Sequence, residues 1–280
     1  PITELAKNSA NAEKFIGIHF FSPVDKMPLV EIICGTETSS ETLARSMDYV
    51  KAIRKTPIVV NDSRGFYTSR VFGTYVSEGI AMLAEGVNPA LIDNAGKMAG
   101  MPVGPLALAD EVALDLIYKI RNQTKLDLGD KYIEAPSDGA VTKMVEDLGR
   151  VGKRENKGFY DYPQNGKKHL WPELGQHFKQ LPENEQPSLD EVIKRLIYIQ
   201  SVETARCMEE KVVTSPEDAD VGSILGWGFA PSRGGAISQI HTVGVDNFVS
   251  DCDRMAQLYG ARFTPPKMMK PKIKTIKVAA

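Results

Sequence analysis

Two short apolar segments carry the most informative residues of this chain, in the stretch Gly17-Ile-His19-Phe-Phe-Ser-Pro-Val-Asp-Lys-Met-Pro-Leu-Val-Glu31-Ile-Ile. The segments cover residues 15–21 and 29–33, and the link between them contains two prolines. Such segments pair as neighbouring strands, which brings His19 and Glu31 within reach of each other. A neutral imidazole accepts a proton near pH 7, and a nearby carboxylate orients it. The stretch therefore predicts a general-base dyad for a substrate hydroxyl.

The same two residues also allow a purely structural interpretation. A lone histidine in an apolar strand is usually a packed core residue, and a glutamate on the next strand is usually exposed. Paired titratable groups are enriched at functional sites but are not confined to them. Spacing alone leaves both interpretations open.

A resemblance to a known family favours catalysis. The stretch above and the later Thr56-Pro-Ile-Val-Val-Asn-Asp-Ser-Arg-Gly-Phe-Tyr-Thr-Ser-Arg70 resemble two consecutive blocks of the 3-hydroxyacyl-CoA dehydrogenases of fatty-acid β-oxidation. The similarity continues to about Pro266. It implies NAD-dependent oxidation of L-3-hydroxyacyl-CoA to 3-ketoacyl-CoA, with His19 as the general base oriented by Glu31.

Two serines stand where this family usually has asparagine. The resemblance implies that Ser69 binds substrate and that Ser22 contacts the nicotinamide of NAD. A serine hydroxyl has one donor and a shorter reach than an asparagine amide. Ser69 can equally be a helix residue bonded to its own backbone. Arg70 and Lys26 are candidate anchors for acyl-CoA phosphates, although a solvated surface position is the commoner role for both.

The predicted fold class is mainly α. The resemblance implies two tandem helical dehydrogenase C-terminal units, 6-phosphogluconate-dehydrogenase-like, preceded by the last strands of a Rossmann-type α/β domain. The predicted domains are a remnant of an NAD-binding Rossmann domain at 1–61, helical domains at 62–170 and 171–266, and a basic tail at 267–280. Hydrophobic periodicity predicts long helices over 65–85, 105–126 and 189–212.

Acidic residues recur in the two halves of the chain at a nearly constant offset. The pattern Glu78-x6-Glu85, Pro89-x3-Asp93 and Gly104-x10-Asp115 parallels Glu203-x6-Glu210, Pro216-x3-Asp220 and Gly235-x10-Asp246. A repeat of this length indicates a duplicated domain. Short dehydrogenases of the family dimerise through one such unit, and the resemblance implies that a second unit can occupy the partner's place. An unrelated second helical domain is the alternative.

The chain contains no Gly-x-Gly-x-x-Gly motif for a dinucleotide pyrophosphate. The nearest approach, Gly226-Trp-Gly228-Phe-Ala-Pro231, lacks the third glycine. The resemblance therefore implies the C-terminal part of a multifunctional fatty-acid oxidation complex alpha subunit, lacking the N-terminal part of its NAD-binding domain. We expect the isolated chain to be inactive, and the parent protein to associate with a thiolase subunit.

Composition excludes several other classes. A net charge of −2, with 42% hydrophobic and 25% charged residues, is that of an ordinary globular protein and argues against nucleic-acid or membrane partners. The three cysteines are widely spaced and form no cluster with histidine, so we expect no metal site and a reducing interior. The expected location is a bacterial-type cytoplasm or another intracellular compartment of β-oxidation.

Two other functions compete with this hypothesis. A non-catalytic assembly module would use the helical repeats only to bind a partner such as thiolase, but it would not need a dyad. A dehydrogenase for a branched or hydroxybutyryl substrate would keep the dyad. Product analysis across acyl chain lengths separates that possibility from the leading one.

Overall fold

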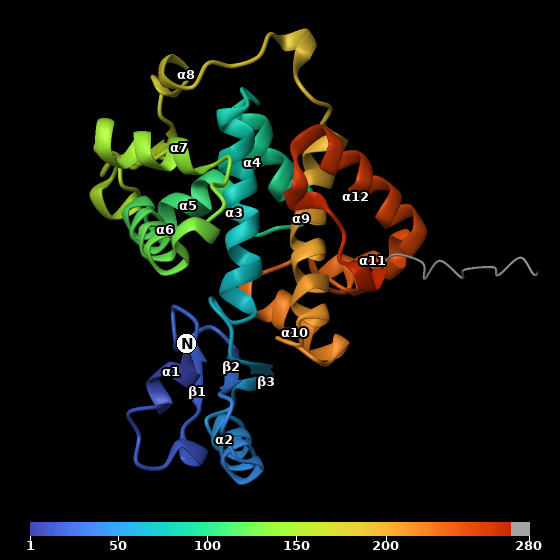
Figure 1. The fold of residues 1–280 in the computed structure, drawn as a ribbon. Coiled ribbons are helices and arrows are strands. Elements are labelled where there is room, and N and C mark those ends of the chain that lie inside the picture. The colour runs from blue at the N-terminus through green and yellow to red at the C-terminus, as the bar shows by residue number, and fades with distance from the viewer. Residues whose placement is uncertain (270–280) are drawn as a thin grey trace, which may run out of the picture. The chain divides into compact units, whose positions relative to one another are not determined.

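The computed structural model describes residues 1–269 and has a mixed α/β fold (Figure 1). The predicted mainly α class is wrong, because the N-terminal segment forms a three-stranded sheet with a crossover helix before the long helices begin. The predicted tail lies outside the described residues from 270 onward. The chain divides into two compact units, residues 1–71 with 200 onward, and residues 72–199.

The sheet of the first unit has the order β1-β2-β3, with β1 antiparallel and β3 parallel to β2. Its elements are β1 (Gly17–Phe20), β2 (Leu29–Cys34), α2 (Ser40–Ala52) and β3 (Thr56–Asn61). Helix α2 makes the crossover and begins where the Ser39 hydroxyl accepts a hydrogen bond from Thr42 N at 3.2 Å. Val30 and Ile32 of β2 pack with Val50 of α2, which fixes the sheet against the helix.

The rest of the first unit is helical. It contains α1 (Ile2–Ala6), η1 (Ala12–Lys14), the first turn of α3 (Thr68–Ala84), the end of α9 (Leu189–Glu209), α10 (Pro216–Trp227), η6 (Pro231–Arg233), α11 (Ser238–Val243), α12 (Val245–Tyr259), η7 (Ala261–Phe263) and η8 (Lys267–Met269). Helix α10 lies against the sheet through glycines. A Cβ at Gly226 would stand 2.9 Å from the Leu29 side chain, and one at Gly222 would stand 2.8 Å from that of Ile58. Gly226, in the motif that superficially resembles a phosphate loop, therefore serves helix–sheet packing.

The second unit consists mainly of helices, with one two-stranded sheet. It contains the remainder of α3, α4 (Pro89–Met98), α5 (Pro105–Val112), α6 (Leu114–Leu128), η2 (Gly129–Lys131), α7 (Asp138–Thr142), η3 (Lys143–Asp147), η4 (Lys153–Glu155), β4 (Tyr160–Asp161), β5 (His169–Leu170), α8 (Leu174–His177), η5 (Glu183–Glu185) and the start of α9. The single helix predicted over 105–126 is in fact two. Ala113 has φ +83° between them, and Leu114 N donates to Val151 O at 2.8 Å.

A buried or half-buried carboxylate holds the start of one helix in each unit. Asp93 accepts hydrogen bonds from two backbone N–H groups in the first turn of α5, and Asp220 accepts them from two at the start of α11. A glycine lies beside each carboxylate, because a Cβ at Gly104 or Gly235 would stand within 2.5 Å of it. Anionic groups are stabilised at helix N-termini. Asp93 and Asp220 are equivalent positions of the proposed sequence repeat, and the two carboxylates have the same structural role.

Candidate active site

His19 and Glu31 face each other across β1 and β2. They are directly opposite in the antiparallel register, and directly opposite residues place their side chains on one face of the sheet. His19 Nδ1 lies 2.9 Å from Glu31 Oε2. The predicted proximity of the two side chains is therefore confirmed.

Glu31 is fully buried, with 0% of its side chain exposed. Its Oε1 accepts hydrogen bonds from the backbone N–H groups of Tyr67 and Thr68, at 2.9 and 3.1 Å. Its Oε2 accepts one from the Thr68 hydroxyl at 2.7 Å, in addition to His19. These donors satisfy the hydrogen-bonding capacity of both carboxylate oxygens, which lie at the N-terminus of α3. The buried Glu31 carboxylate that bonds the imidazole therefore has hydrogen-bond partners for both of its oxygens.

A tight turn before α3 aims these donors at Glu31. Gly65 and Phe66 both have left-handed backbone conformations, with φ +74° and +51°. Such a conformation suits glycine but is strained for phenylalanine. The helix consequently begins at Thr68 instead of Gly65, and the peptide N–H groups of the turn's end point to the carboxylate.

The His19 ring is partly open to solvent. Its side chain is 30% exposed, and its ring stands 4.6 Å from Phe21 and 5.9 Å from Phe66. Because a carboxylate can only accept, a neutral imidazole that bonds Glu31 carries its proton on Nδ1 and its lone pair on Nε2. Nε2 is then the basic nitrogen that can receive a proton from a ligand.

The other predicted contacts lie at the ends of the same elements. Ser22 is exposed just beyond β1, and Ser69 is exposed in the first turn of α3. Lys26 is exposed in the β1–β2 link. None of these placements tests a ligand contact, so the roles of both serines stay proposals.

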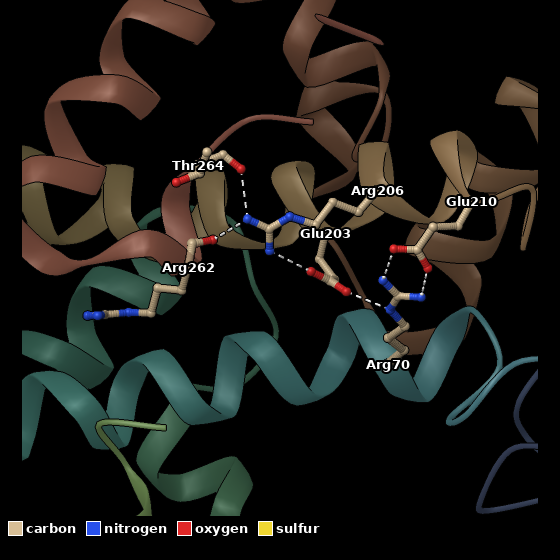
Figure 2. Close-up of polar contacts among 6 residues, drawn as sticks. All are labelled: Arg70, Glu203, Arg206, Glu210, Arg262 and Thr264. Carbon is tan, nitrogen blue, oxygen red and sulfur yellow. Dashed lines mark hydrogen bonds and ion pairs between the residues drawn. The ribbon is translucent and has the colours of Figure 1, made fainter. Parts of the chain in front are cut away.

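Arg70 is engaged within the protein and is not available as a phosphate anchor (Figure 2). Its Nε lies 2.5 Å from Glu203, and its two terminal nitrogens bond Glu210 at 2.5 and 3.1 Å. Glu203 also accepts a bond from Arg206 at 2.9 Å, as Figure 2 shows. Arg206 in turn donates to the backbone carbonyl oxygens of Arg262 and Thr264. The network ties the first turn of α3 to α9.

Sequence analysis missed two residues of this site, Tyr67 and Thr68. Burial raises the pKa of the Tyr67 phenol well above its usual value, so the group stays neutral. Its hydroxyl donates to Ala219 O at 2.8 Å, and its ring packs on Trp227 at 5.5 Å. Thr68 is buried against Glu31. Both lie directly before Ser69 in the Gly65–Arg70 motif, and no local pattern links them to Glu31.

A cavity of about 700 Å³ lies elsewhere in the first unit. Its lining includes Ile16 and Ile18, with Thr42 and Tyr49 from α2, but neither member of the dyad. The candidate active site is therefore defined by the hydrogen bonds around Glu31 and not by this cavity.

Two regions of the chain match one enzyme family. Residues 65–162 match the C-terminal domain of 3-hydroxyacyl-CoA dehydrogenase, and residues 1–63 match its NAD binding domain. Together they cover more than half of the chain. The chain belongs to the 3-hydroxyacyl-CoA dehydrogenase family. The family is one of NAD-dependent oxidoreductases, and the match at residues 1–63 explains why a mixed α/β class replaces the mainly α prediction.

Curated relatives of this chain are named as subunits of a complex. The fatty acid oxidation complex subunit alpha proteins of Idiomarina loihiensis and Shewanella oneidensis are each 37% identical to it over 270 residues. The alignments cover 96% of this chain but 38% of each relative. The chain thus spans little more than a third of their length.

Solved structures support the fold assignment. A 3-hydroxybutyryl-CoA dehydrogenase from Escherichia coli has a TM-score of 0.77 at 20% identity, over 96% of this chain and 72% of that one. An (S)-3-hydroxybutyryl-CoA dehydrogenase from Ralstonia eutropha is 37% identical, with a TM-score of 0.53 over 58% of this chain and 57% of that one. The first similarity bears on the fold alone, whereas the second also supports the family.

Proposed function

We propose that the protein containing this chain oxidises L-3-hydroxyacyl-CoA to 3-ketoacyl-CoA in fatty-acid β-oxidation. The observation that carries the proposal is the buried Glu31 carboxylate bonded to Nδ1 of His19 at 2.9 Å. The alpha-subunit names of the relatives support the β-oxidation context.

His19 is the proposed general base. Its Nε2 takes the proton of the 3-hydroxyl as a hydride leaves C3, and Glu31 stabilises the imidazolium that forms. Bound NAD supplies the hydride acceptor. A positioned general base contributes about 10²–10⁴ in rate. Ser69 is the proposed donor to the substrate carbonyl, and its exposed place on α3 is compatible with that role.

The proposed cofactor contact lies at the nicotinamide end of NAD. Ser22 is exposed just beyond β1, the strand that carries His19, and is our proposed contact to the nicotinamide. The chain has no glycine-rich strand–turn–helix motif to hold a pyrophosphate. We therefore assign Ser22 alone as a cofactor contact.

The proposed parent is a multifunctional alpha subunit that binds a thiolase subunit in a bacterial cytoplasm. We propose the same domains as the sequence predicts, including two duplicated helical domains at residues 62–170 and 171–266. The paired roles of Asp93 and Asp220 support that duplication. Among the helices of the described residues, none is long and apolar enough to cross a membrane.

The competing proposal is a non-catalytic assembly module. A buried carboxylate is costly unless it is paired and hydrogen-bonded, and an assembly surface gains nothing from one beneath a half-exposed imidazole. The geometry at Glu31 thus favours the enzyme.

The test is NADH oxidation by the protein at its full natural length, with 3-ketoacyl-CoA substrates from four carbons to long chains. The proposal predicts turnover that requires both the thioester and NADH. Loss of turnover for every chain length in a folded, NADH-binding preparation would favour the assembly module. A response confined to four carbons would point to a hydroxybutyryl-type enzyme.

A further inference from the structure

Thr68 makes a side-chain contact that the general-base proposal does not yet use. Its hydroxyl donates to Glu31 Oε2 at 2.7 Å, and Oε2 is the same oxygen that accepts from His19 Nδ1 at 2.9 Å. The backbone N–H of Thr68 bonds the other oxygen at 3.1 Å. One residue therefore contacts both oxygens of the carboxylate that orients the imidazole.

We propose that Thr68 is a positioning residue that sets the orientation and the charge of the Glu31 carboxylate beneath His19. The inference rests on the proposed function, since it deepens the role of the same dyad. The side chain is suited to this role because it is buried and anchored at the first residue of α3. A β-branched side chain has few rotamers in a helix, so the hydroxyl is held in place.

The electrostatic consequence has a definite sign. The hydrogen bond from the Thr68 hydroxyl stabilises the negative charge on Oε2 and so reduces the attraction that this oxygen exerts on the imidazolium. If the Thr68 hydroxyl is removed, Oε2 interacts with His19 alone and stabilises the imidazolium more strongly. The imidazole would then hold its proton to a higher pH and would be a less available base near neutral pH.

Two ionisable groups near Glu31, Tyr67 and Cys207, do not titrate between pH 5 and 9. Burial raises the pKa of Tyr67 well above its usual value and that of Cys207 to about 12, and both groups sense the Glu31 charge. Arg70, which also acts on Cys207, stays charged and is paired with Glu203 and Glu210. A change in the titration of His19 between pH 5 and 9 therefore reports on the dyad.

The neighbours of Thr68 keep it in place even without its hydroxyl. Its methyl group lies against α10, because a Cβ at Gly226 would stand 3.4 Å from Thr68 Cγ2. Thr68→Val keeps this methyl contact and the backbone bond to Glu31, and removes only the hydroxyl. Thr68→Ser keeps the hydroxyl and removes the methyl. The two variants separate the hydrogen bond from the packing.

The test is an NMR titration of the His19 imidazole in the 280-residue chain, which contains four histidines. We expect the midpoint to rise by about 0.5–1 pH unit in Thr68→Val, as for the loss of one hydrogen bond to a charged group. It should stay near wild type in Thr68→Ser. Thr124→Val is the matched control, because that hydroxyl bonds only its own helix at Ile120 O in the part of the chain described. The midpoint of His19 should not move in the control.

The same variants in the protein at its natural length give a second measurement. In the direction of 3-hydroxyacyl-CoA oxidation by NAD, where His19 must be neutral, the acid limb of kcat/KM should shift to higher pH in Thr68→Val, with little change in KM. An unshifted midpoint in folded Thr68→Val would overturn the inference. If that variant fails to fold, Thr68→Ala should show the same rise, and an unshifted midpoint there would equally overturn the inference. The two proposals can fail separately. If the His19 midpoint rises in Thr68→Val but the wild-type protein has no dehydrogenase activity, the proposed function is overturned, while the role of Thr68 in positioning Glu31 is supported.

Discussion

Arg70 and Arg195, which lie 125 positions apart in the sequence, make equivalent ion pairs. Each binds two glutamates seven positions apart: Glu203 and Glu210 for Arg70, and Glu78 and Glu85 for Arg195. The glutamates of one arginine also lie 125 positions from those of the other. Each proposed repeat thus gives an arginine to the other's glutamates. Reciprocal exchange of this kind is typical of an isologous two-fold interface and supports the proposed duplication.

The first prediction concerns the buried pair of Arg195 and Glu78, whose side chains are 2% and 1% exposed. Arg195→Met removes the cation of this buried ion pair, and breaking such a pair by removing one partner typically costs about 3–5 kcal/mol. We expect the free energy of unfolding in urea to fall by that amount. Adding Glu78→Leu should recover most of the loss, because an apolar pair can replace a buried ion pair.

A surface pair provides the control for that experiment. Arg45 and Glu41 lie one helical turn apart on α2 and are both exposed. Such pairs contribute about 0.3–0.5 kcal/mol. Arg45→Met should therefore be nearly neutral, and equal losses in both arginine variants would refute the importance of the buried pair.

The second prediction concerns Asp110, which accepts backbone hydrogen bonds from Phe159 and Tyr160. Burial raises its pKa to about 6, although these bonds act to lower it. The folded state then binds more protons than the unfolded state between about pH 4 and 6, so stability falls as the pH rises through this window. The loss of stability is at most about 3 kcal/mol and is complete above about pH 6.

Asp110→Asn isolates this effect from the other carboxylates. The variant cannot titrate at this position, so the stability of wild type relative to it should decline from pH 4 to pH 7. Urea unfolding at each pH gives the difference directly. A constant difference, or one that increases with pH, would show that Asp110 is ionised throughout.

The third prediction compares two helix glycines. A Cβ at Gly73 in α3 would have nothing within 4 Å, so Gly73→Ala should stabilise the protein by up to about 1 kcal/mol through helix propensity. A Cβ at Gly222 would stand 2.8 Å from Ile58 and 3.0 Å from the buried Tyr67 ring. We expect Gly222→Ala to destabilise by about 1–3 kcal/mol through overpacking. Thermal unfolding measures the melting temperature of each variant. If both melting temperatures rose, or both fell, relative to wild type, the packing argument would be contradicted.

The sequence predicted the dyad because strand geometry has few solutions. Two apolar segments with a short link pair in antiparallel fashion, and their register then places His19 opposite Glu31. The donors to Glu31 were not predictable in the same way. Tyr67 and Thr68 lie more than 35 positions away, and their approach depends on a left-handed Phe66 that no local rule favours.

The fold class was wrong for a related reason. Most of the sequence has helical periodicity, which favoured a mainly α class. The three short strands β1, β2 and β3 nevertheless form a sheet, and helix α2, which connects β2 to β3, packs on it to form a core. The break at Ala113 was also missed, because neither glycine nor proline marks it. The backbone N–H of Leu114 donates a hydrogen bond to the carbonyl oxygen of Val151, which is distant in the sequence. Local helix propensity cannot predict such a contact.

The central claim is that His19 removes the substrate proton. The most direct measurement is the kcat and KM of His19→Ala in the protein at its full natural length, with acetoacetyl-CoA and NADH. The account predicts that kcat falls by about 10²–10⁴ while KM changes little, since the imidazole acts in the proton transfer rather than in binding. Turnover close to that of wild type in the variant would contradict it.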